Sequence, residues 1–364
     1  MSARPAGGCR PSQHRREAAI TTITQPAPAR ITVGVDTHAE VHVAVANDGF
    51  GRRLDTISVA TTPAGYAELL GWAQRLGQVE GWGIEGTGSF GAGLTRFLHR
   101  HGQLVVEVNR PDRQARRRRG KSDPLDAEAA ARAVQARQGA VPKAGDGQVE
   151  MIRSLRVARA TAMKARTQAI NALKALVVTA PDELREQLRA LSAVRLVQIA
   201  ASLEPDPVTT PAAAAGLGLR TLARRYQALS AELAVLDAEL DRLTRAAAPK
   251  LVALFGVGSD SAGALLVAAG DNPDRLRSNA CFSMLCGASP IQASSGKTQR
   301  HRLNRGGDRQ ANAALYRIVI ARLRHDQQTK DYLDRRIREG KSKKEAIRCL
   351  KRYVAREVFA VLRP

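Results

Sequence analysis

Apolar and polar positions alternate through the first patterned part of the chain. From Ile31 to Thr61, three apolar runs are separated by the turn signals Asp-Thr-His-Ala and Asn-Asp-Gly-Phe-Gly. An alternation with a period of two is typical of half-buried strands. The pattern therefore predicts a meander of three adjacent strands.

The period then switches between helix and strand. An amphipathic helix is predicted from Thr62 to Leu76, then a glycine-flanked strand ending at Glu85, a helix through Leu98, and a fifth strand over Gln103–Asn109. An alanine-rich helix follows. This order predicts an α/β domain over residues 30–140.

Residues 141–247 are predicted to be a linker and a helical coiled-coil region. The linker, Gly139 to Val149, precedes helices over Met151–Val178 and Asp182–Leu203. In the next helix, spacings of four and three alternate over three heptads at Leu222, Tyr226, Leu229, Leu233, Leu236, Leu240 and Leu243. This is the spacing of a coiled-coil seam, which could pack within the chain or between chains.

Residues 248–364 are predicted to form a small all-α domain. Two short helices around a Gly-Val-Gly turn, in LVALFGVGSDSAGALLVAAGD, are similar to a helix-hairpin-helix, whose amides can hold a phosphate. A plain helical turn uses glycines in the same way. Cys281 and Cys286 are expected in the core, and the last helices over Asn312–Leu323 and Lys343–Leu362.

The net charge of the chain indicates what kind of partner it binds. Lys and Arg total 57 against 34 Asp and Glu, a formal net charge of +23 over 364 residues. An excess of this size favours nucleic acid as the partner. Aromatic residues are only 4%, so pairing of Arg and Lys with phosphates is expected to outweigh base stacking.

Several classes of protein are excluded by what the sequence lacks. Residues 1–29 have no periodicity and are predicted to be a disordered basic tail. The four cysteines show no CxxC spacing, which argues against a zinc site or a disulfide framework. No apolar run has the length of a membrane span, and no signal core is present. We expect no membrane contact and a cytoplasmic, nucleoid-associated location.

Basic residues gather in two stretches that are expected to bind nucleic acid. One leads up to the alanine-rich helix, and the other surrounds a Ser-Ser-Gly loop. They comprise Arg116, Arg117, Arg118, Arg119 and Lys121 in the first, and Lys297, Arg300, Arg302, Arg305 and Arg309 in the second. The basic side of the helix Met151–Val178 is either a third contact or a solvated face.

Asp123 and Asp126 lie three residues apart, on one face of the alanine-rich helix. Neighbouring carboxylates repel each other unless a cation lies between them, so the pair is a candidate metal site. Asp is also favoured at N-caps and in first helical turns, so capping is an equal alternative. Asp36 ends the first predicted strand, where turn formation is its alternative.

Three motifs occur in a distinctive order: GVDTHAEVHVAV, GIEGTGSF and GKSDPLDAEAAARAV. With the predicted strand order, they resemble the RNase H-like fold, and more closely the RuvC-like domain of the DEDD transposases, the insertion-sequence one-hundred-and-ten family. The resemblance implies a metal-binding tetrad of Asp36, Glu85, Asp123 and Asp126, holding Mg²⁺ or alternatively Mn²⁺. It favours metal binding over capping and turn formation.

The carboxyl-terminal region resembles the same family through SSGK and HRLNRGGDRQAN. A hydroxyl held among cations is a candidate nucleophile, although most Ser-Ser-Gly triplets are ordinary loops. In that family the serine directly before the glycine attacks DNA, which implies that Ser295 becomes joined to the scissile phosphate. Ser294 occupies a variable position.

The resemblance implies a transposase that recombines double-stranded donor and target DNA. It also implies a structured non-coding guide RNA, the bridge RNA, as the source of sequence specificity, and a homo-oligomer, dimer or tetramer, is expected. Two other functions fit the residues: a junction-resolving nuclease of the same fold that uses metal-activated water, and a nucleic-acid-binding protein with a decayed active site. The presence of all four acids argues against decay.

Overall fold

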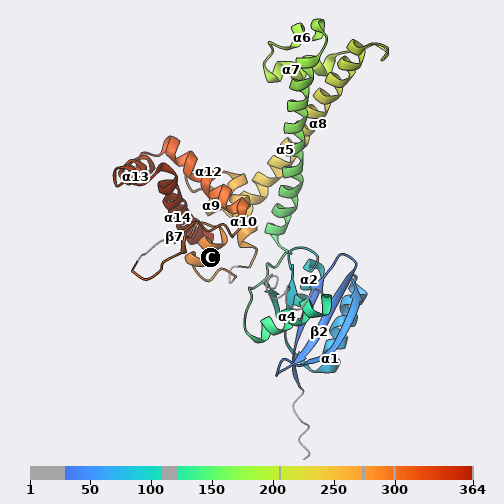
Figure 1. The fold of residues 1–364 in the computed structure, drawn as a ribbon, viewed down its shortest axis with the longest axis vertical. Coiled ribbons are helices and arrows are strands. Elements are labelled where there is room, and N and C mark those ends of the chain that lie inside the picture. Colours follow the sequence, from blue (N-terminus) through green and yellow to red (C-terminus); the bar gives the residue numbers. More distant parts are fainter. Residues whose placement is uncertain (1–28, 109–121, 205, 273–274, 298–300, 363–364) are drawn as a thin grey trace, which may run out of the picture.

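The computed structural model describes residues 29–108, 122–204, 206–272, 275–297 and 301–362. Figure 1 shows a sheet domain, a long two-helix arm and a helical carboxyl-terminal domain. Almost all of the predicted tail, and the whole first basic stretch, lie outside the described residues.

One mixed sheet forms the amino-terminal domain, with strand order β3-β2-β1-β4-β5. The strands are β1 Arg30–Thr37, β2 Val41–Asp48, β3 Arg53–Ala60, β4 Gln78–Glu85 and β5 Val105–Val108. The first three pair antiparallel, whereas β4 is parallel to β1 and β5 to β4. The predicted meander and the mixed α/β class are confirmed, and β1 and β4 end at the same edge.

Helices cover both faces of this sheet. Side chains alternate along β1, so Val33 points into a core shared with α1 (Pro63–Leu76) and α2 (Ala92–Arg100). Gly34 faces the opposite side, against α4 (Asp123–Gln135). The helix with the acidic pair therefore packs on the face of β1 that carries its even-numbered residues, opposite α1 and α2.

Glycines let α4 lie directly on the strand backbones. A Cβ at Gly34 would be 1.9 Å from the carbonyl oxygen of Ala127, and one at Gly83 would be 2.4 Å from that of Ala130. The helix meets these glycines with small alanine side chains, so the two backbones approach closely. The contact fixes the position of α4 on β1 and β4.

The middle of the chain forms two long helices joined by shorter ones: α5 Gln148–Thr179, α6 Asp182–Leu188, α7 Ala193–Ser202 and α8 Pro211–Ala247. Arg159 of α5 pairs with Asp237 of α8, and seven residues further along α5 the guanidinium of Arg166 lies over the ring of Tyr226. From the first contact to the second, residue numbers rise along α5 and fall along α8, so the two helices are antiparallel. The helix predicted over Asp182–Leu203 is interrupted, because Ser192 begins a new helix as the N-cap of α7.

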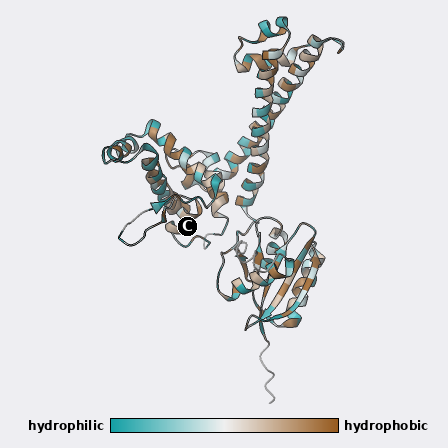
Figure 2. Ribbon diagram, viewed as in Figure 1, coloured by the Kyte–Doolittle hydropathy of each residue, from teal (hydrophilic) through white to brown (hydrophobic). Residues whose placement is uncertain are grey.

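The predicted leucine seam of α8 packs within the chain, against α5. Leu233, Leu240 and Leu243 are buried, and the other four seam positions are partly buried. Apolar and polar residues alternate along both helices, as Figure 2 shows. Supercoiling of the pair stays a prediction. Across the described residues, no helix combines the length and the apolar character needed to span a membrane.

Separate apolar clusters stabilise the two ends of the arm. At the tip, Leu173 and Leu219 of the long helices pack with Leu188 of α6. At the base, Ile152 and Leu240 belong to the core of the carboxyl-terminal domain. The arm base and that domain therefore share one core.

The carboxyl-terminal domain is built of helices and one short hairpin: α9 Pro249–Val252, α10 Ser259–Ala269, α11 Asn279–Leu285, β6 Ile291–Gln292, β7 His301–Arg302, α12 Arg309–His325, α13 Gln327–Arg338 and α14 Lys343–Leu362. The first helix of the helix-hairpin-helix-like start is thus a single turn. Cys286 is buried as predicted, but Cys281 is exposed, and its prediction is wrong because α11 packs inward through Phe282 instead.

The predicted linker is attached at both ends. Ala140 pairs with Glu107 of β5 in an isolated β-bridge. On the other side, Nδ2 of Asn272 donates to the carbonyl oxygen of Pro142 at 2.9 Å, and its Oδ1 accepts from the N–H of Ala144 at 3.3 Å. The linker is therefore held against the carboxyl-terminal domain.

Basic residues at the base of α5 are engaged in ion pairs. Nη1 of Arg156 lies 2.6 Å from one oxygen of Asp260, and Nη2 of Arg317 lies 2.8 Å from the other. Arg153 pairs with Glu150. Asp260 thus joins α5, α10 and α12, which favours a structural role for this part of the predicted third basic surface.

Candidate active site

Two acids leave neighbouring strands side by side. In the register of β1 and β4, Val35 lies opposite Ile84, so the following residues, Asp36 and Glu85, lie at the adjacent carboxyl ends of the two strands. Oγ1 of Thr37 donates a hydrogen bond to the carbonyl oxygen of Glu85 at 2.8 Å, which ties the strand ends to each other. The two carboxylates consequently share one edge of the sheet.

The first turn of α4 brings two more acids to this edge. Asp123 and Asp126 both lie in that turn, but the N-cap position belongs to Ser122. Neither Asp is therefore the cap itself, although an acid in a first turn also interacts favourably with the helix dipole. Because α4 rests on Gly34, which faces the same side of β1 as Asp36, both helix acids approach Asp36.

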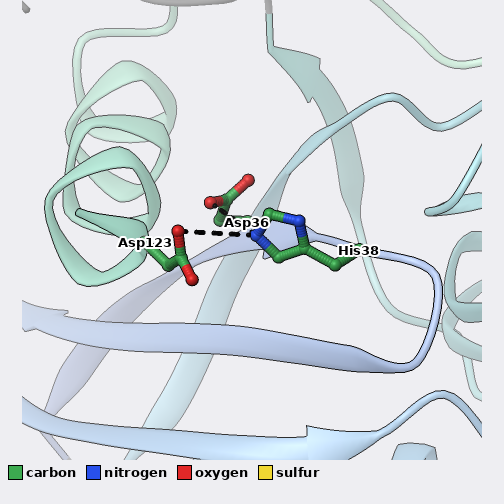
Figure 3. A group of neighbouring side chains, drawn as sticks. All are labelled: Asp36, His38 and Asp123. Atoms are coloured by element: carbon green, nitrogen blue, oxygen red, sulfur yellow. Dashed lines mark ion pairs between the residues drawn. The ribbon is translucent and has the colours of Figure 1, made fainter. Parts of the chain in front are cut away.

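Asp36, His38 and Asp123 form a tight group (Figure 3). Nε2 of His38 is 3.3 Å from Oδ2 of Asp36 and 3.6 Å from Oδ1 of Asp123. One ligand atom from each of the three lies within 4.8 Å of the others. Sequence reasoning treated His38 only as part of a turn, although the Asp-Thr-His spacing, which places both side chains on one side of an extended chain, was a usable signal.

Asp36 has the clearest electrostatic perturbation. Its side chain is 11% exposed, and burial raises the pKa of its carboxyl group, an effect that His38 partly offsets. The other three acids raise the pKa of Asp36 further, in the order Asp126, Asp123 and Glu85. The other three members of the predicted tetrad therefore all repel the negative charge of the buried Asp36 carboxylate. A cation beside Asp36 would relieve that repulsion.

The donor atoms fit a divalent cation. Carboxylate oxygens are the ligands that Mg²⁺ and Mn²⁺ prefer, and an imidazole nitrogen is acceptable to Mn²⁺. Asp36 and Asp123 offer oxygens within the tight group, while Glu85 and Asp126 add negative charge next to it. The arrangement can hold a cation at the edge of the sheet, open to a phosphate.

Ser295 lies in a different part of the molecule, between β6 and β7 of the carboxyl-terminal domain. It is exposed, as is Ser294, whose Oγ accepts a hydrogen bond from Nε2 of Gln292 at 3.4 Å. Gly296 has a φ of +54°, and a Cβ there would have nothing within 4 Å. Figure 1 shows β7 in a lobe separate from the sheet domain, so Ser295 is not part of the acidic group.

The structure describes four of the five predicted nucleic-acid-binding residues of the second stretch, and they lie around this loop. All four are exposed: Lys297, Arg302, Arg305 and Arg309. Arg300 and the entire first stretch, Arg116, Arg117, Arg118, Arg119 and Lys121, lie outside the described residues.

Two family models match the chain, and between them they cover more than half of it. One, for DEDD transposases of IS110 elements and described as a transposase, matches residues 33–181, which hold all four acids. The other, described as the transposase IS116/IS110/IS902 family, matches residues 248–334, which hold Ser295.

A curated relative supports the same assignment over part of its length. The "Insertion element IS110 uncharacterized 43.6 kDa protein" of Streptomyces coelicolor is 30% identical over 146 residues. The match takes in 39% of this chain and 36% of the relative, so the chain spans little more than a third of that protein.

Proposed function

Because this chain belongs to the IS116/IS110/IS902 family of transposases, we propose that it cuts and rejoins DNA strands when an insertion sequence moves. The observation that carries the proposal is the acidic group, in which the buried carboxyl of Asp36 lies against Asp123. Acids arranged in this way can hold a cation beside a phosphate. The strand order further supports an RNase H-like, RuvC-like domain.

In this proposal Asp36 and Asp123 bind the cation, Mg²⁺ or Mn²⁺, and Glu85 and Asp126 complete the tetrad. A bound divalent ion polarises the scissile phosphate and offsets the charge that develops in phosphoryl transfer. The chain supplies the positioning. Its strand register fixes Asp36 beside Glu85, and the contact of α4 on Gly34 fixes the helix acids above them.

Ser295 is the proposed nucleophile. Its Oγ attacks phosphorus, an Oγ–P bond forms, and the bond from phosphorus to one bridging oxygen breaks. The serine proton is lost and the departing oxygen gains a proton, so a free hydroxyl end and a serine–DNA ester result. The exposure of Ser295 and the open space at Gly296 allow a DNA backbone to approach, and Lys297 and Arg302 can stabilise its phosphate.

We further propose a structured non-coding RNA, the bridge RNA, as the guide. In support, the described basic residues of the second stretch are exposed and suited to phosphates, so base pairing by an RNA would supply the specificity that they cannot. A homo-oligomer, dimer or tetramer, is part of the same proposal. Apolar side chains on the outside of the arm, Val157 (55% exposed) and Val235 (66% exposed), support a partner surface there.

The test is the covalent adduct. The full chain is incubated with labelled double-stranded donor and target DNA, Mg²⁺ and RNA that co-purifies with it, and then separated by denaturing electrophoresis. Wild-type protein and Ser294→Ala should carry the label, and Ser295→Ala should not. Label on Ser295→Ala but not on Ser294→Ala would move the nucleophile by one residue.

The location of Ser295 and the acids in separate lobes favours a second candidate, a nuclease that uses metal-activated water. The same experiment separates the two. Mg²⁺-dependent strand cleavage without label on any protein variant would select the nuclease and reject the serine mechanism.

A further inference from the structure

Lys351 of α14 has a partly buried ammonium group without an acidic partner. Its Nζ donates to Oδ1 of Asn312 at 2.7 Å, and Nδ2 of Asn312 donates to the carbonyl oxygen of Cys286 at 2.7 Å. Burial lowers the pKa of Lys351, and Arg348 lowers it further. Among the described residues, no Asp or Glu forms an ion pair with Lys351. A buried cation of this kind lacks a counter-anion.

A pocket of about 340 Å³ opens beside Lys351, between α14 and the segment that leads into α12. Arg305 and Arg309 also line it. The carboxylate of Asp308 lines the pocket too, where its Oδ1 caps α12 by accepting from the N–H groups of Gln310 and Ala311, so one negative charge stands against three positive ones. Three positive side chains therefore line one cavity.

The backbone of the pocket is fixed by Gly307. Its φ of +86° favours glycine, and a Cβ there would be 2.5 Å from the carbonyl oxygen of Leu285. The turn Asn304–Asp308 is consequently held against α11. One water molecule takes up about 30 Å³, so a cavity of about 340 Å³ holds a group many times that size. It therefore has room for a phosphodiester group.

We propose that this pocket binds a backbone phosphate of DNA, with Lys351 and Asn312 at its floor and Arg305 and Arg309 at its rim. DNA is favoured because the pocket segment directly follows β7, one of the two strands that bracket Ser295. A strand anchored here would be held at the base of the loop that carries the hydroxyl. The assignment of DNA rests on the proposed function, whereas anion binding rests on the pocket alone.

The test is the salt dependence of binding by the full chain. Affinity for a labelled double-stranded DNA is measured by fluorescence anisotropy over a range of KCl concentrations. Losing one phosphate contact should reduce the slope of log affinity against log salt by about one. We expect this for Lys351→Met, which keeps the apolar stem, and for Arg309→Gln, whose side chain is exposed and leaves the core untouched.

Lys344→Met is the matched control, because Lys344 is an exposed lysine on the same helix and its loss changes the net charge equally. Its slope should stay at the wild-type value. Equal effects of Lys344→Met and Lys351→Met would show diffuse attraction and overturn the site. An unchanged slope for Arg309→Gln would overturn it as well, even if Lys351→Met failed to fold by circular dichroism.

Two further results separate this proposal from the proposed function. If Lys351→Met weakens binding to a single-stranded RNA but not to DNA, the assignment of DNA is wrong. If the reduced DNA slope appears while no serine adduct forms in the wild type, the pocket stands and the serine mechanism falls. If the wild type forms the adduct but Lys351→Met and Arg309→Gln leave the slope unchanged, the serine mechanism stands and the pocket proposal falls.

Discussion

The carbonyl oxygen of Ala127 occupies the space where a side chain of residue 34 would begin. Only 1.9 Å separates it from the position of a Cβ on Gly34. The glycine is therefore part of the acidic site although it bears no chemical group. It sets how closely Asp123 and Asp126 approach Asp36.

Gly34→Ala should destabilise the protein by about 2 kcal/mol, since the added methyl group must push α4 away from the sheet. Chemical denaturation monitored by circular dichroism measures this. Gly49→Ala is the control, because a Cβ at Gly49 meets nothing within 4 Å, and it should change stability by less than about 0.5 kcal/mol. Equal stability of the two variants would mean that α4 does not rest on β1.

Asp36→Asn should stabilise the metal-free protein and remove its response to Mg²⁺. Burial and three neighbouring acids raise the pKa of Asp36 in the folded state, so its ionisation at neutral pH costs folding free energy. Removing the charge removes that cost. Thermal unfolding should show a higher Tm for the variant without metal, and a rise with Mg²⁺ only for the wild type. A Mg²⁺-induced rise of the same size in both proteins would exclude Asp36 as a ligand.

Strand cleavage should fall by on the order of 100-fold or more in each of Asp36→Asn, Glu85→Gln, Asp123→Asn and Asp126→Asn. Each variant loses a negative charge that helps to hold the cation, and the cation is what offsets the charge developing on the phosphate in the transition state. DNA affinity should change little, since acids do not pair with phosphates. Cleavage rates in Mg²⁺ and anisotropy titrations measure the two effects separately. Wild-type cleavage by any one variant would remove that residue from the tetrad.

Asp260→Asn should destabilise the base of the arm by about 1 kcal/mol at neutral pH, a value reduced because the Asp260 side chain is 38% exposed. Burial alone would raise the pKa of Asp260, but Arg156, Arg317 and Arg159 lower it overall. A lowered folded pKa gives stability that is present above the unfolded pKa and is lost as the pH falls through the folded one.

The difference between wild type and Asp260→Asn should therefore shrink below about pH 4, where Asp begins to protonate. Urea unfolding at several pH values measures it. Asp182→Asn is the matched control, because Asp182 forms only an exposed pair with Arg185, and it should have almost no effect. A pH-independent difference would show that Asp260 acts through packing instead of charge.

Local patterns drew attention to three of the acids, but they left capping and turn formation open, and only the resemblance to a family grouped all four. Asp36 interrupts an apolar strand, and Asp123 and Asp126 share a helical face. The contact of His38 with Asp36 had a local signal in the Asp-Thr-His spacing, but its contact with Asp123 depends on α4, 85 residues away, whose approach no local pattern reports. Lys351 was missed for a similar reason. Its missing counter-anion is visible only when α14 packs beside the turn before α12.

Helix α13 shows a different limit. Only Thr329 of its residues is buried, so its apolar pattern in the sequence is weak. Tyr332 packs partly buried against the carboxyl-terminal core, and Arg335 and Arg336 pair with Glu339. The leucine seam gave the reverse difficulty. Its spacing indicated a packed helix clearly, but the same spacing suits a partner in the same chain or in another.

The arm has a mechanical consequence. With 32 residues in α5, it extends about 48 Å at 1.5 Å per residue. Because Ile152 and Leu240 fix its base in the core of the carboxyl-terminal domain, arm and domain turn together as a lever. A rotation of about 10° at the base would carry the tip through roughly 8 Å by the same geometry, so whatever holds the tip also sets where the Ser295 loop points.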